Sequence, residues 1–370
     1  MAITKIDIEA FLALSQTHHV LDVRSPGEYQ QAHIPGAFSL PLFSDEERKN
    51  IGTVYKQQNR ETAIKIGLGF FGPNMRTIVE TAEKIISEPA NPPTRNPQPA
   101  THHPPPATVV VHCWRGGMRS AAIAWLLDLY GFKVYTLIGG YKSYRNWVLQ
   151  QFEKEYPFII IGGYTGSGKT LLLHKLKDTA NAIIDLEALA KHKGSALGGL
   201  GPDVQPRQEM FENLLAQALS ASGESPAIYT EDESQRIGNL QIPMALWNTM
   251  RNRPVCFFDI PFEERLNYLT EEYSVYSKEK LVNAVTRIQK RLGGLETKNA
   301  IGFLLEDNHK ECFRILLKYY DKYYLKGLYN REHADNLIIK IEAGSVDTEN
   351  NFELLKKEGD KVFTEQTWEK

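Results

Sequence analysis

Features that would place a chain of this length in a specialised class are scarce. Only three cysteines occur in 370 residues, Cys113, Cys256 and Cys312, and their spacing fits neither a disulfide framework nor a zinc motif. A reducing cytosol suits such a chain. No apolar run is long enough to span a bilayer, and the first residues lack the pattern of a signal peptide. We therefore expect a cytoplasmic protein without a membrane partner, and we favour a monomer.

Positively and negatively charged residues are also nearly balanced. Lys and Arg number 43 and Asp and Glu number 45, which gives a formal net charge of −2. The surface as a whole therefore cannot act as a nucleic-acid binder, and any such surface must be a local patch. Internal repeats are absent from the sequence. The length predicts two or three domains.

The most informative stretch surrounds Cys113. An apolar, β-branched run ends at His112 and Cys113, two glycines follow, and a helical apolar pattern runs over 121–127. A strand, a tight loop and a helix in this order direct backbone N–H groups at one point, which lowers the pKa of a thiol placed there. Arg115 and Arg119 add positive charge that can bind an oxyanion. We interpret Cys113 as a nucleophile facing an anionic donor; the alternative is a buried structural cysteine.

Strand and helix patterns alternate around this loop and predict a parallel sheet covered by helices. The expected strands are 19–24, 39–43 and 133–138, and the expected helices are 6–14, 45–58, 74–87 and 121–130. We interpret the glycine-rich run 64–72 as a packed turn, with a lid over Cys113 as the alternative. The proline-rich stretch at about 88–107 cannot form a helix or a central strand and is interpreted as an insertion.

A second strong motif follows the strand predicted to begin at Phe158. Gly163-x4-Gly168-Lys169-Thr170 matches the P-loop pattern, and a helical pattern at 171–176 follows it. Backbone N–H groups of such a loop bind a diphosphate, Lys169 would reach its outer oxygens, and Thr170 could hold Mg²⁺. The candidate phosphate-binding residues of this loop are Gly163, Thr165, Gly166, Ser167, Gly168, Lys169 and Thr170.

Carboxylates follow the next predicted strands, at 182–187 and 227–231. Asp185, Glu231 and Asp232 are expected at the edge of the sheet where ligands bind, as part of a metal shell or to position a base. Capping of the following helices is the equally weighted alternative. No group of residues has the spacing of a resident metal site. The glycine-rich segment 192–201 is expected to fold over a substrate, or else to be a connector.

The rest of the chain is predicted to be mainly helical, with helices at 263–273, 281–292 and 312–329, a strand at 336–341 and a charged tail. The second helix carries Arg287, Lys290 and Arg291. In the third, lysines recur at four-residue spacing beside two pairs of tyrosines: Lys318, Lys322, Lys326, Tyr319/Tyr323 and Tyr320/Tyr324. A solvated lysine stripe above packed tyrosines is the usual interpretation; an RNA-contacting face is the alternative.

Four stretches of the first 145 residues resemble a rhodanese domain: 21–29, 33–37, the Cys113 loop and 134–140. The resemblance implies that the loop cysteine carries a transferable sulfur as a persulfide, and that Asp22 and Arg24 fix the loop. Cys113-x5-Arg119 is one residue longer than the usual rhodanese loop and matches the loops of tyrosine phosphatases and arsenate reductases. The loop alone therefore fits chalcogen transfer or phosphate-ester cleavage.

The two motifs together, with Asp185–Ala190, Gly194–Ser195 and Glu231–Gly238, closely resemble the tRNA 2-selenouridine synthase family. This resemblance implies an α/β fold class: a rhodanese-like parallel-sheet domain at 1–148, then a P-loop NTPase-like α/β domain at 155–345 with a helical C-terminal part, and a charged tail at 346–370.

The resemblance also implies a transferase whose partner is tRNA. The wobble 2-thiouridine would be S-geranylated with geranyl diphosphate and then converted to 2-selenouridine with selenium from selenophosphate. Cys113 would carry the selenium as a selenosulfide, Arg115 and Arg119 would bind the phosphate, and the P-loop, with Asp185 and Glu231 near it, would bind the diphosphate. The sequence does not exclude ATP or GTP as the ligand of the P-loop. Two other classes of function also remain as alternatives: a sulfurtransferase or phosphatase with a nucleotide-binding regulatory domain, and a nucleotide-switched binding module.

Overall fold

The computed structural model describes residues 3–87, 107–178, 182–195, 197–201, 204–223 and 225–365. The chain divides into two compact units, unit 1 at Met1–Gln150 and unit 2 at Gln151–Lys370. Each contains a parallel sheet covered by helices, so the predicted α/β fold class is confirmed. Within the described ranges no helix is long and apolar enough to cross a membrane. The expected proline-rich insertion lies almost wholly outside the described residues.

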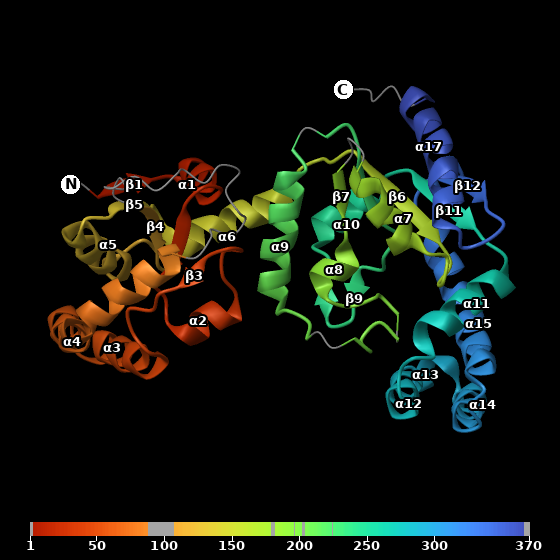
Figure 1. Ribbon diagram of the computed structural model, residues 1–370, viewed down its shortest axis with the longest axis horizontal. Helices are drawn as coiled ribbons and strands as arrows, with labels where there is room; N and C mark the ends of the chain where they lie inside the picture. The colour runs from red at the N-terminus through yellow and green to blue at the C-terminus, as the bar shows by residue number, and fades with distance from the viewer. Residues whose placement is uncertain are drawn as a thin grey trace. The chain divides into compact units, whose positions relative to one another are not determined.

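The sheet of unit 1 has five parallel strands in the order β1-β5-β4-β2-β3 (Figure 1). β4 pairs with β2 from Val109 to His112, and this central position directs the Cys113 loop to the carboxyl edge of the sheet. The elements of unit 1 are β1 (Thr4–Ile6), α1 (Ile8–Ser15), β2 (His19–Asp22), α2 (Pro26–Gln31), β3 (Phe38–Ser39), α3 (Asp45–Gln57), α4 (Arg60–Ser87), β4 (Thr108–His112), α5 (Met118–Tyr130), β5 (Lys133–Leu137) and α6 (Gly140–Gln151).

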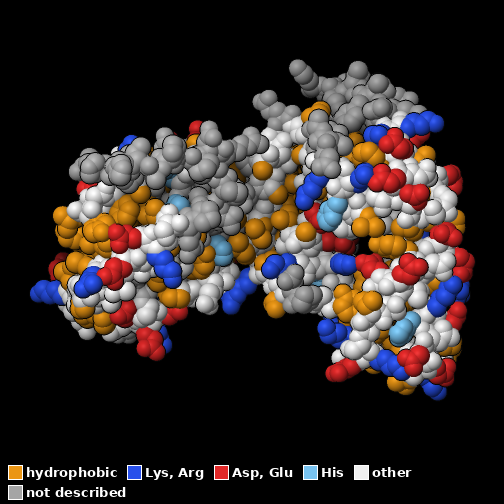
Figure 2. Space-filling view, viewed as in Figure 1, with side chains coloured by type: hydrophobic (Ala, Val, Ile, Leu, Met, Phe, Trp, Pro, Cys, Tyr) orange, Lys and Arg blue, Asp and Glu red, His pale blue; other side chains and the backbone are white. Residues whose placement is uncertain are grey.

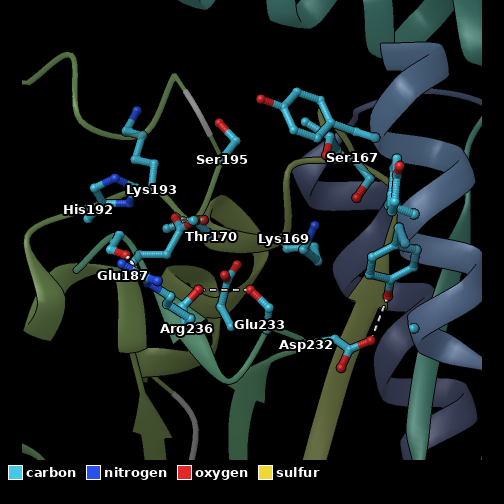
Figure 3. A pocket seen from close by; sticks show the side chains of 18 of the residues that line it. Ser167, Lys169, Thr170, Glu187, His192, Lys193, Ser195, Asp232, Glu233 and Arg236 are labelled. Carbon is cyan, nitrogen blue, oxygen red and sulfur yellow. Dashed lines mark hydrogen bonds between the residues drawn. The ribbon is translucent and has the colours of Figure 1, made fainter. Parts of the chain in front are cut away.

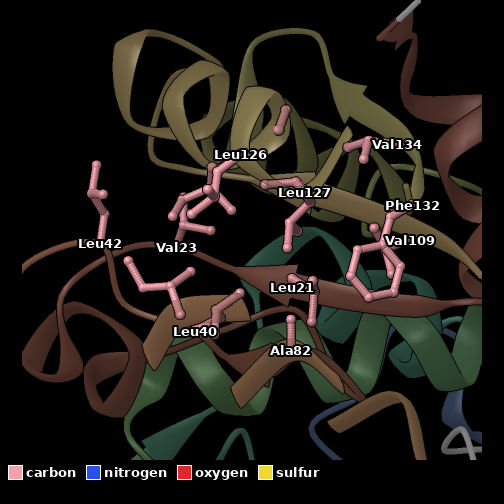
Figure 4. Close-up of a cluster of buried hydrophobic side chains, with 14 of the residues drawn as sticks. Leu21, Val23, Leu40, Leu42, Ala82, Val109, Leu126, Leu127, Phe132 and Val134 are labelled. Atoms are coloured by element: carbon pink, nitrogen blue, oxygen red, sulfur yellow. The ribbon is translucent and has the colours of Figure 1, made fainter. Parts of the chain in front are cut away.

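The core of unit 1 forms where α4 and α5 cover one face of this sheet. Alternate strand residues such as Leu21 and Val109 meet Ala82 of α4 and Leu127 of α5, and all four are fully buried (Figure 4). Alternation of strand side chains between the two faces leaves His112 on the opposite face, where its ring meets Phe11 of α1 and Tyr141 of α6. Helices thus cover both faces, as the alternating pattern predicts.

Two predictions for unit 1 differ from the structure. The strand predicted at 39–43 is only the two residues Phe38–Ser39. The glycine-rich run 64–72 is neither a turn nor a lid, because it lies inside the single 28-residue helix α4, which also contains Pro73. A side chain at Gly67 would contact Phe43 at 3.4 Å, and Phe71, one turn further on, is buried. The glycine therefore permits close packing within a helix, and tertiary burial outweighs the low helix propensity of glycine.

Unit 2 contains a five-stranded parallel sheet in the order β12-β11-β6-β8-β7 and a two-stranded antiparallel ribbon of β9 and β10. The strands and 3₁₀ helix are β6 (Phe158–Gly163), η1 (Leu176–Asp178), β7 (Ala182–Ile184), β8 (Ile228–Glu231), β9 (Arg236–Ile237), β10 (Leu240–Gln241), β11 (Val255–Asp259) and β12 (Ile338–Glu342). The helices are α7 (Lys169–Lys175), α8 (Leu186–Ala190), α9 (Gln208–Ala221), α10 (Met244–Arg251), α11 (Phe262–Tyr273), α12 (Lys278–Arg287), α13 (Gln289–Leu292), α14 (Gly294–Leu305), α15 (His309–Leu328), α16 (Ala334–Leu337) and α17 (Thr348–Glu365).

β6 lies at the centre of this sheet, so the loop that follows it lies at the carboxyl edge between β11 and β8. α7 and α17 cover one face, and Leu355 of α17 is fully buried there beside Leu173 of α7. Part of the expected charged tail is therefore a packed helix of the unit. Helices α11, α12, α14 and α15 form a separate apolar cluster, the predicted helical part, in which Leu316 and Leu281 are fully buried.

The helix expected at 281–292 is two helices, α12 and α13, and the strand expected at 182–187 ends at Ile184, where α8 follows. The visible face of unit 2 carries acidic and basic side chains interspersed, and it is hollowed between the side of α8 and β9 and that of α11 and α15 (Figure 2). This hollow belongs to the site described next.

Candidate active site

Cys113 lies at the base of an exposed loop that joins β4 to α5. Its side chain is only 3% exposed, whereas the backbone and side chains from Trp114 to Met118 are exposed. Ser120, in the first turn of α5, places its Oγ 3.3 Å from the Cys113 sulfur. The thiol therefore sits beneath an open loop and against a helix start, the placement expected from the sequence.

Two opposing effects act on this thiol. Burial raises the pKa of Cys113, but hydrogen bonds from Ser120 and from the backbone N–H groups of Arg115, Gly117 and Ser120 outweigh burial and bring the pKa below its usual value. No hydrogen bond from the described residues offsets burial at the other two cysteines, and burial raises the pKa of Cys256 and of Cys312 to about 12. Among the three, Cys113 alone is electrostatically prepared to be a nucleophile.

The start of α6 holds the Cys113 loop from the other side. The N–H groups of Tyr141 and Lys142 donate to the carbonyl oxygens of Cys113 and Trp114 at 2.8 and 3.0 Å. Gly140 has a φ of +60°, and a Cβ there would lie 2.4 Å from the Cys113 carbonyl oxygen. Only glycine permits two backbone segments to approach this closely, so the sequence at 139–140 is part of the loop's construction.

Asp22 and Arg24 form a buried ion pair beneath the loop, as the resemblance to rhodaneses implies. Arg24 Nη2 lies 2.6 Å from Asp22 Oδ2, and both side chains are at most 1% exposed. The Arg24 guanidinium also stacks on the Tyr141 ring, with its carbon 3.8 Å from the ring centroid. The pair thereby fixes the helix start that holds the Cys113 carbonyl.

The two arginines of the loop differ in their surroundings. Arg115 is exposed at the loop. Arg119 donates to both carboxylate oxygens of Glu28 at 2.6 and 3.4 Å, and this pairing lowers the pKa of Glu28 despite its partial burial. Arg119 is thus already engaged with a carboxylate, and Arg115 is the more available of the two for an anion.

The P-loop of unit 2 follows β6, as predicted. Gly163 ends β6, Thr165, Gly166, Ser167 and Gly168 lie in the turn, and α7 begins at Lys169. The Lys169 ammonium donates to the carbonyl oxygens of Gly163 and Tyr164 at 2.9 and 3.3 Å. Lys169 therefore lies across the mouth of its own loop, where a phosphate would meet it.

The carboxylates expected near the P-loop separate into two roles. Asp185 accepts from the N–H of Ala188 at 2.7 Å and pairs with His174. It therefore caps the helix α8, which is the alternative to a place in a metal shell. Glu231, at the end of β8, accepts from Thr170 Oγ1 at 2.6 Å. Thr170 also lies 3.1 Å from Glu187, a residue that the sequence analysis did not single out.

Burial raises the pKa of Glu231, and the neighbouring carboxylates of Glu187 and Asp185 raise it further against the opposing effects of Thr170 and Lys169. Burial also raises the pKa of Glu187. Two carboxyl groups with raised pKa values therefore meet at one P-loop hydroxyl, which is an arrangement typical of functional sites.

Two residues distant in sequence, Tyr324 and Arg265, support the P-loop through contacts that sequence reasoning did not predict. The Tyr324 hydroxyl accepts from the Gly163 N–H at 3.0 Å and donates to Asp232 at 2.8 Å. Arg265 is buried, binds Asp321 through two hydrogen bonds and donates to the Thr165 carbonyl. A Cβ at Gly166, whose φ is +80°, would lie 2.9 Å from the Arg265 carbonyl oxygen. No local motif signals these contacts.

A cavity of about 1860 Å³ opens in front of the P-loop. Figure 3 shows Lys169 and Thr170 at the cavity together with Glu187 and Glu233, and His192 and Lys193 on another side. Described residues of the glycine-rich segment after α8 therefore line the same cavity as the P-loop, and its folding over a substrate stays a prediction.

The comparisons with known proteins bear on both units. Residues 7–146 match the model of the rhodanese-like domain family, and residues 156–347 match that of the tRNA 2-selenouridine synthase AAA domain. The second match covers more than half of the chain and includes the P-loop, the carboxylates and the cavity.

Relatives similar to this chain over both units include three proteins named tRNA 2-selenouridine synthase. That of Sulfurovum sp. (strain NBC37-1) is 33% identical over 79% of this chain and 80% of its own. That of Hydrogenovibrio crunogenus (strain DSM 25203 / XCL-2) is 34% identical over 82% and 88%, and that of Bdellovibrio bacteriovorus (strain ATCC 15356 / DSM 50701 / NCIMB 9529 / HD100) is 32% identical over 84% and 89%. With a rhodanese-like unit, a P-loop unit and similarity of this extent, the chain belongs to the tRNA 2-selenouridine synthase family.

Proposed function

We propose that this chain is a tRNA-modifying transferase that converts wobble 2-thiouridine into 2-selenouridine. The observation that carries the proposal is Cys113, the cysteine that combines a lowered pKa with a place at the base of an exposed loop. Family membership favours tRNA over the generic aryl phosphate or sulfur acceptor that the same loop would also suit. The lowered pKa of the Cys113 thiol favours a catalytic loop over a binding module, because a nucleophilic cysteine reacts as its thiolate.

The first step of the proposal is S-geranylation at the P-loop. The thiocarbonyl sulfur of 2-thiouridine attacks C1 of geranyl diphosphate, a C–S bond forms, and the C–O bond to the diphosphate breaks. The loop N–H groups and Lys169 would stabilise the departing diphosphate, which is anionic and develops its charge there. This position for Lys169 is supported by its place across the loop mouth, 2.9 Å from the Gly163 carbonyl oxygen.

A Mg²⁺ ion fits the donors at the same place. The Thr170 hydroxyl and the carboxylate oxygens of Glu187 and Glu231 would hold it, and Glu231 Oε2 is buried without a hydrogen-bond partner among the described residues. Such an ion supplies neutralising charge to the leaving diphosphate.

The second step replaces the S-geranyl group with selenium. S-alkylation turns a poor leaving group into a thiol leaving group and makes C2 of the ring more electrophilic. The Cys113 thiolate attacks C2, the C2–S bond breaks and geranyl thiol leaves. The selenium of selenophosphate then attacks C2 and displaces Cys113, and water cleaves the Se–P bond, which releases phosphate and leaves 2-selenouridine; a selenosulfide on Cys113 would instead need a two-electron oxidant. Arg115 would bind the phosphate of the donor, and Arg119 is oriented by Glu28. The wobble base has to leave the anticodon stack for either step.

The proposal is tested with 2-thiouridine tRNA, geranyl diphosphate and selenophosphate, each omitted in turn, and with mass analysis of the nucleosides. Cys113→Ala is expected to accumulate S-geranyl-2-thiouridine, whereas Lys169→Ala is expected to leave 2-thiouridine unmodified. Addition of ATP or GTP in place of geranyl diphosphate tests the other occupant of the P-loop. A Cys113→Ala enzyme that still makes 2-selenouridine would refute the assignment.

A further inference from the structure

The cavity of unit 2 has a side wall that neither the P-loop nor its carboxylates explain. Tyr319, Tyr320 and Tyr323 of α15 line it, together with basic residues of the α12–α13 segment: Arg287, Lys290 and Arg291. The Tyr319 and Tyr323 rings lie 4.8 Å apart, and Tyr323 remains 48% exposed despite its size. These six residues are called the tyrosine–arginine wall below.

Charge on this wall is not neutralised. Among the described residues that line the cavity, nine are Lys or Arg and five are Asp or Glu, although the whole chain carries a net charge of −2. Lys193 and Arg331 are paired with Glu272 and Asp232. The ion pairs of the described residues include none made by the three basic residues of the wall, so their charge is available to a ligand.

The lysine stripe noted in the sequence lies elsewhere on the same helix. Lys318, Lys322 and Lys326 are exposed, but none of them lines the cavity. The lysines form a solvated stripe, and Tyr319 and Tyr320 pack partly against the apolar cluster, as the usual interpretation has it; Tyr319, Tyr320 and Tyr323 also line the cavity, whereas the lysines do not. Substitutions on the two faces of α15 can therefore be compared: one face carries the tyrosines of the wall, and the other carries the exposed lysines.

We propose that the tyrosine–arginine wall binds the single-stranded anticodon loop of the RNA substrate, with unpaired bases stacked on the exposed Tyr323 and beside the partly buried Tyr319 and Tyr320, and backbone phosphates bound by Arg287, Lys290 and Arg291. The inference rests on the proposed function, since it assigns a binding surface to that substrate. Aromatic rings beside unpaired cations are the side chains that hold single-stranded nucleic acid.

The size of the cavity favours this ligand over a smaller one. Small-molecule pockets measure roughly 300–1000 Å³. The cavity here measures about 1860 Å³, and charged and aromatic side chains are among the residues that line it. RNA recognition of this type is directed at unstacked loops rather than duplexes, because only there are base faces accessible.

The helix α15, which carries the tyrosines of the wall, also contacts the P-loop. Tyr324 follows Tyr323 directly on α15, and its hydroxyl accepts from the Gly163 N–H of the P-loop. A base stacked at Tyr323 is therefore held on the same helix that contacts the P-loop. An unpaired wobble base from that loop has a short route to the diphosphate-binding turn.

The test measures the Kd of the full chain for a fluorescein-labelled anticodon stem-loop that carries 2-thiouridine, by anisotropy over a series of salt concentrations. We expect Tyr323→Leu to weaken binding about fivefold or more, the range of one lost base stack. We expect Arg291→Gln to weaken binding and to reduce the slope of log Kd against log salt concentration by about 0.7, the value for one phosphate contact of a single strand. Lys322→Gln, a cation on the other face of α15, serves as matched control and is expected to change Kd less than about twofold.

Three results would overturn the inference: a Tyr323→Leu variant that binds normally, a Lys322→Gln variant that loses as much as Arg291→Gln, or competition by an unlabelled RNA duplex of equal length as strong as that by the unlabelled stem-loop. Thermal unfolding of each variant separates loss of binding from loss of fold. If the wild-type chain fails to make 2-selenouridine while the variants lose binding as expected, the proposed function fails and the binding surface stands. If the wild-type chain makes 2-selenouridine and the wall variants bind normally, the proposed function stands and the binding surface fails.

Discussion

Thr170 Oγ1 lies 2.6 Å from Glu231 Oε1 and 3.1 Å from Glu187 Oε2. A hydroxyl has one proton to donate, so it satisfies one of the two carboxylates. The other contact is favourable only when that carboxyl group is itself protonated and donates to Thr170. The raised pKa values of both glutamates agree with a proton retained in this cluster.

This proton makes the stability of unit 2 depend on pH. A carboxyl whose pKa is higher in the folded than in the unfolded state binds more protons when folded, so stability falls as pH rises from its usual pKa through the raised one. Glu231→Gln is therefore expected to gain stability over the wild type as pH rises from 5 to 8, by about 1.4 kcal/mol for each unit by which the pKa is raised. Denaturant unfolding at several pH values measures the difference.

The matched control for this experiment is Glu296→Gln on α14, because Glu296 is exposed. The same change of side chain at this exposed position gives the baseline against which the Glu231→Gln difference is compared. A Glu231→Gln variant whose advantage does not grow with pH would show that the cluster holds no proton.

A second prediction concerns the thiolate of Cys113. Ser120→Ala removes the hydroxyl 3.3 Å from the sulfur, so the pKa of Cys113 should rise. We expect alkylation by iodoacetamide at pH 7 to slow by up to about tenfold, the effect of roughly 1.4 kcal/mol in a hydrogen bond to a charged group, and the rates to converge at high pH. Peptide mass analysis should find Cys256 and Cys312 unlabelled in the folded protein, since burial raises both pKa values to about 12. An unchanged pH midpoint would count against the role of Ser120.

A third prediction concerns the buried pair beneath the loop. Arg24→Met leaves the Asp22 carboxylate buried and without its main partner, which costs about 3–5 kcal/mol of stability in unit 1. The double variant Asp22→Leu, Arg24→Met removes both charges and should recover most of that loss. Urea unfolding measures both variants. If the double variant is no more stable than the single one, the arginine contributes by packing on Tyr141 rather than by its charge.

These interactions show which parts of the molecule a sequence can predict. Both loops were recognisable because a strand, a turn and a helix follow one another within about fifteen residues, and Glu231 was placed near the P-loop because carboxyl ends of parallel strands share one edge. The contacts of Tyr324 with Gly163 and of Arg265 with Thr165 join segments more than 90 residues apart, and no local pattern encodes them.

The same limit explains the error at 64–72. Glycines there were taken to mark a turn, but the helix α4 is decided by what it packs on, with Gly67 against Phe43 and Phe71 buried. The sequence left the role of Asp185 open, and it predicted an oxyanion rather than a carboxylate as the partner of Arg119. A cap on α8 and a pair with Glu28 depend on neighbours whose positions only the fold provides.

The last prediction isolates the close approach of two backbone segments at Cys113. Gly140→Ala places a Cβ 2.4 Å from the Cys113 carbonyl oxygen and 2.5 Å from the Gly116 nitrogen, at a φ of +60° that costs a further 1–2 kcal/mol or so in an L residue. Both obstacles are backbone atoms, so the loop has to move, and alkylation of Cys113 at pH 7 should slow together with a loss of stability. Gly117→Ala is the matched control, because a Cβ at Gly117 meets nothing within 4 Å and its φ is −100°. Equal reactivity of the two variants would mean that the start of α6 does not hold the loop, and that the thiolate depends on Ser120 and the loop N–H groups alone.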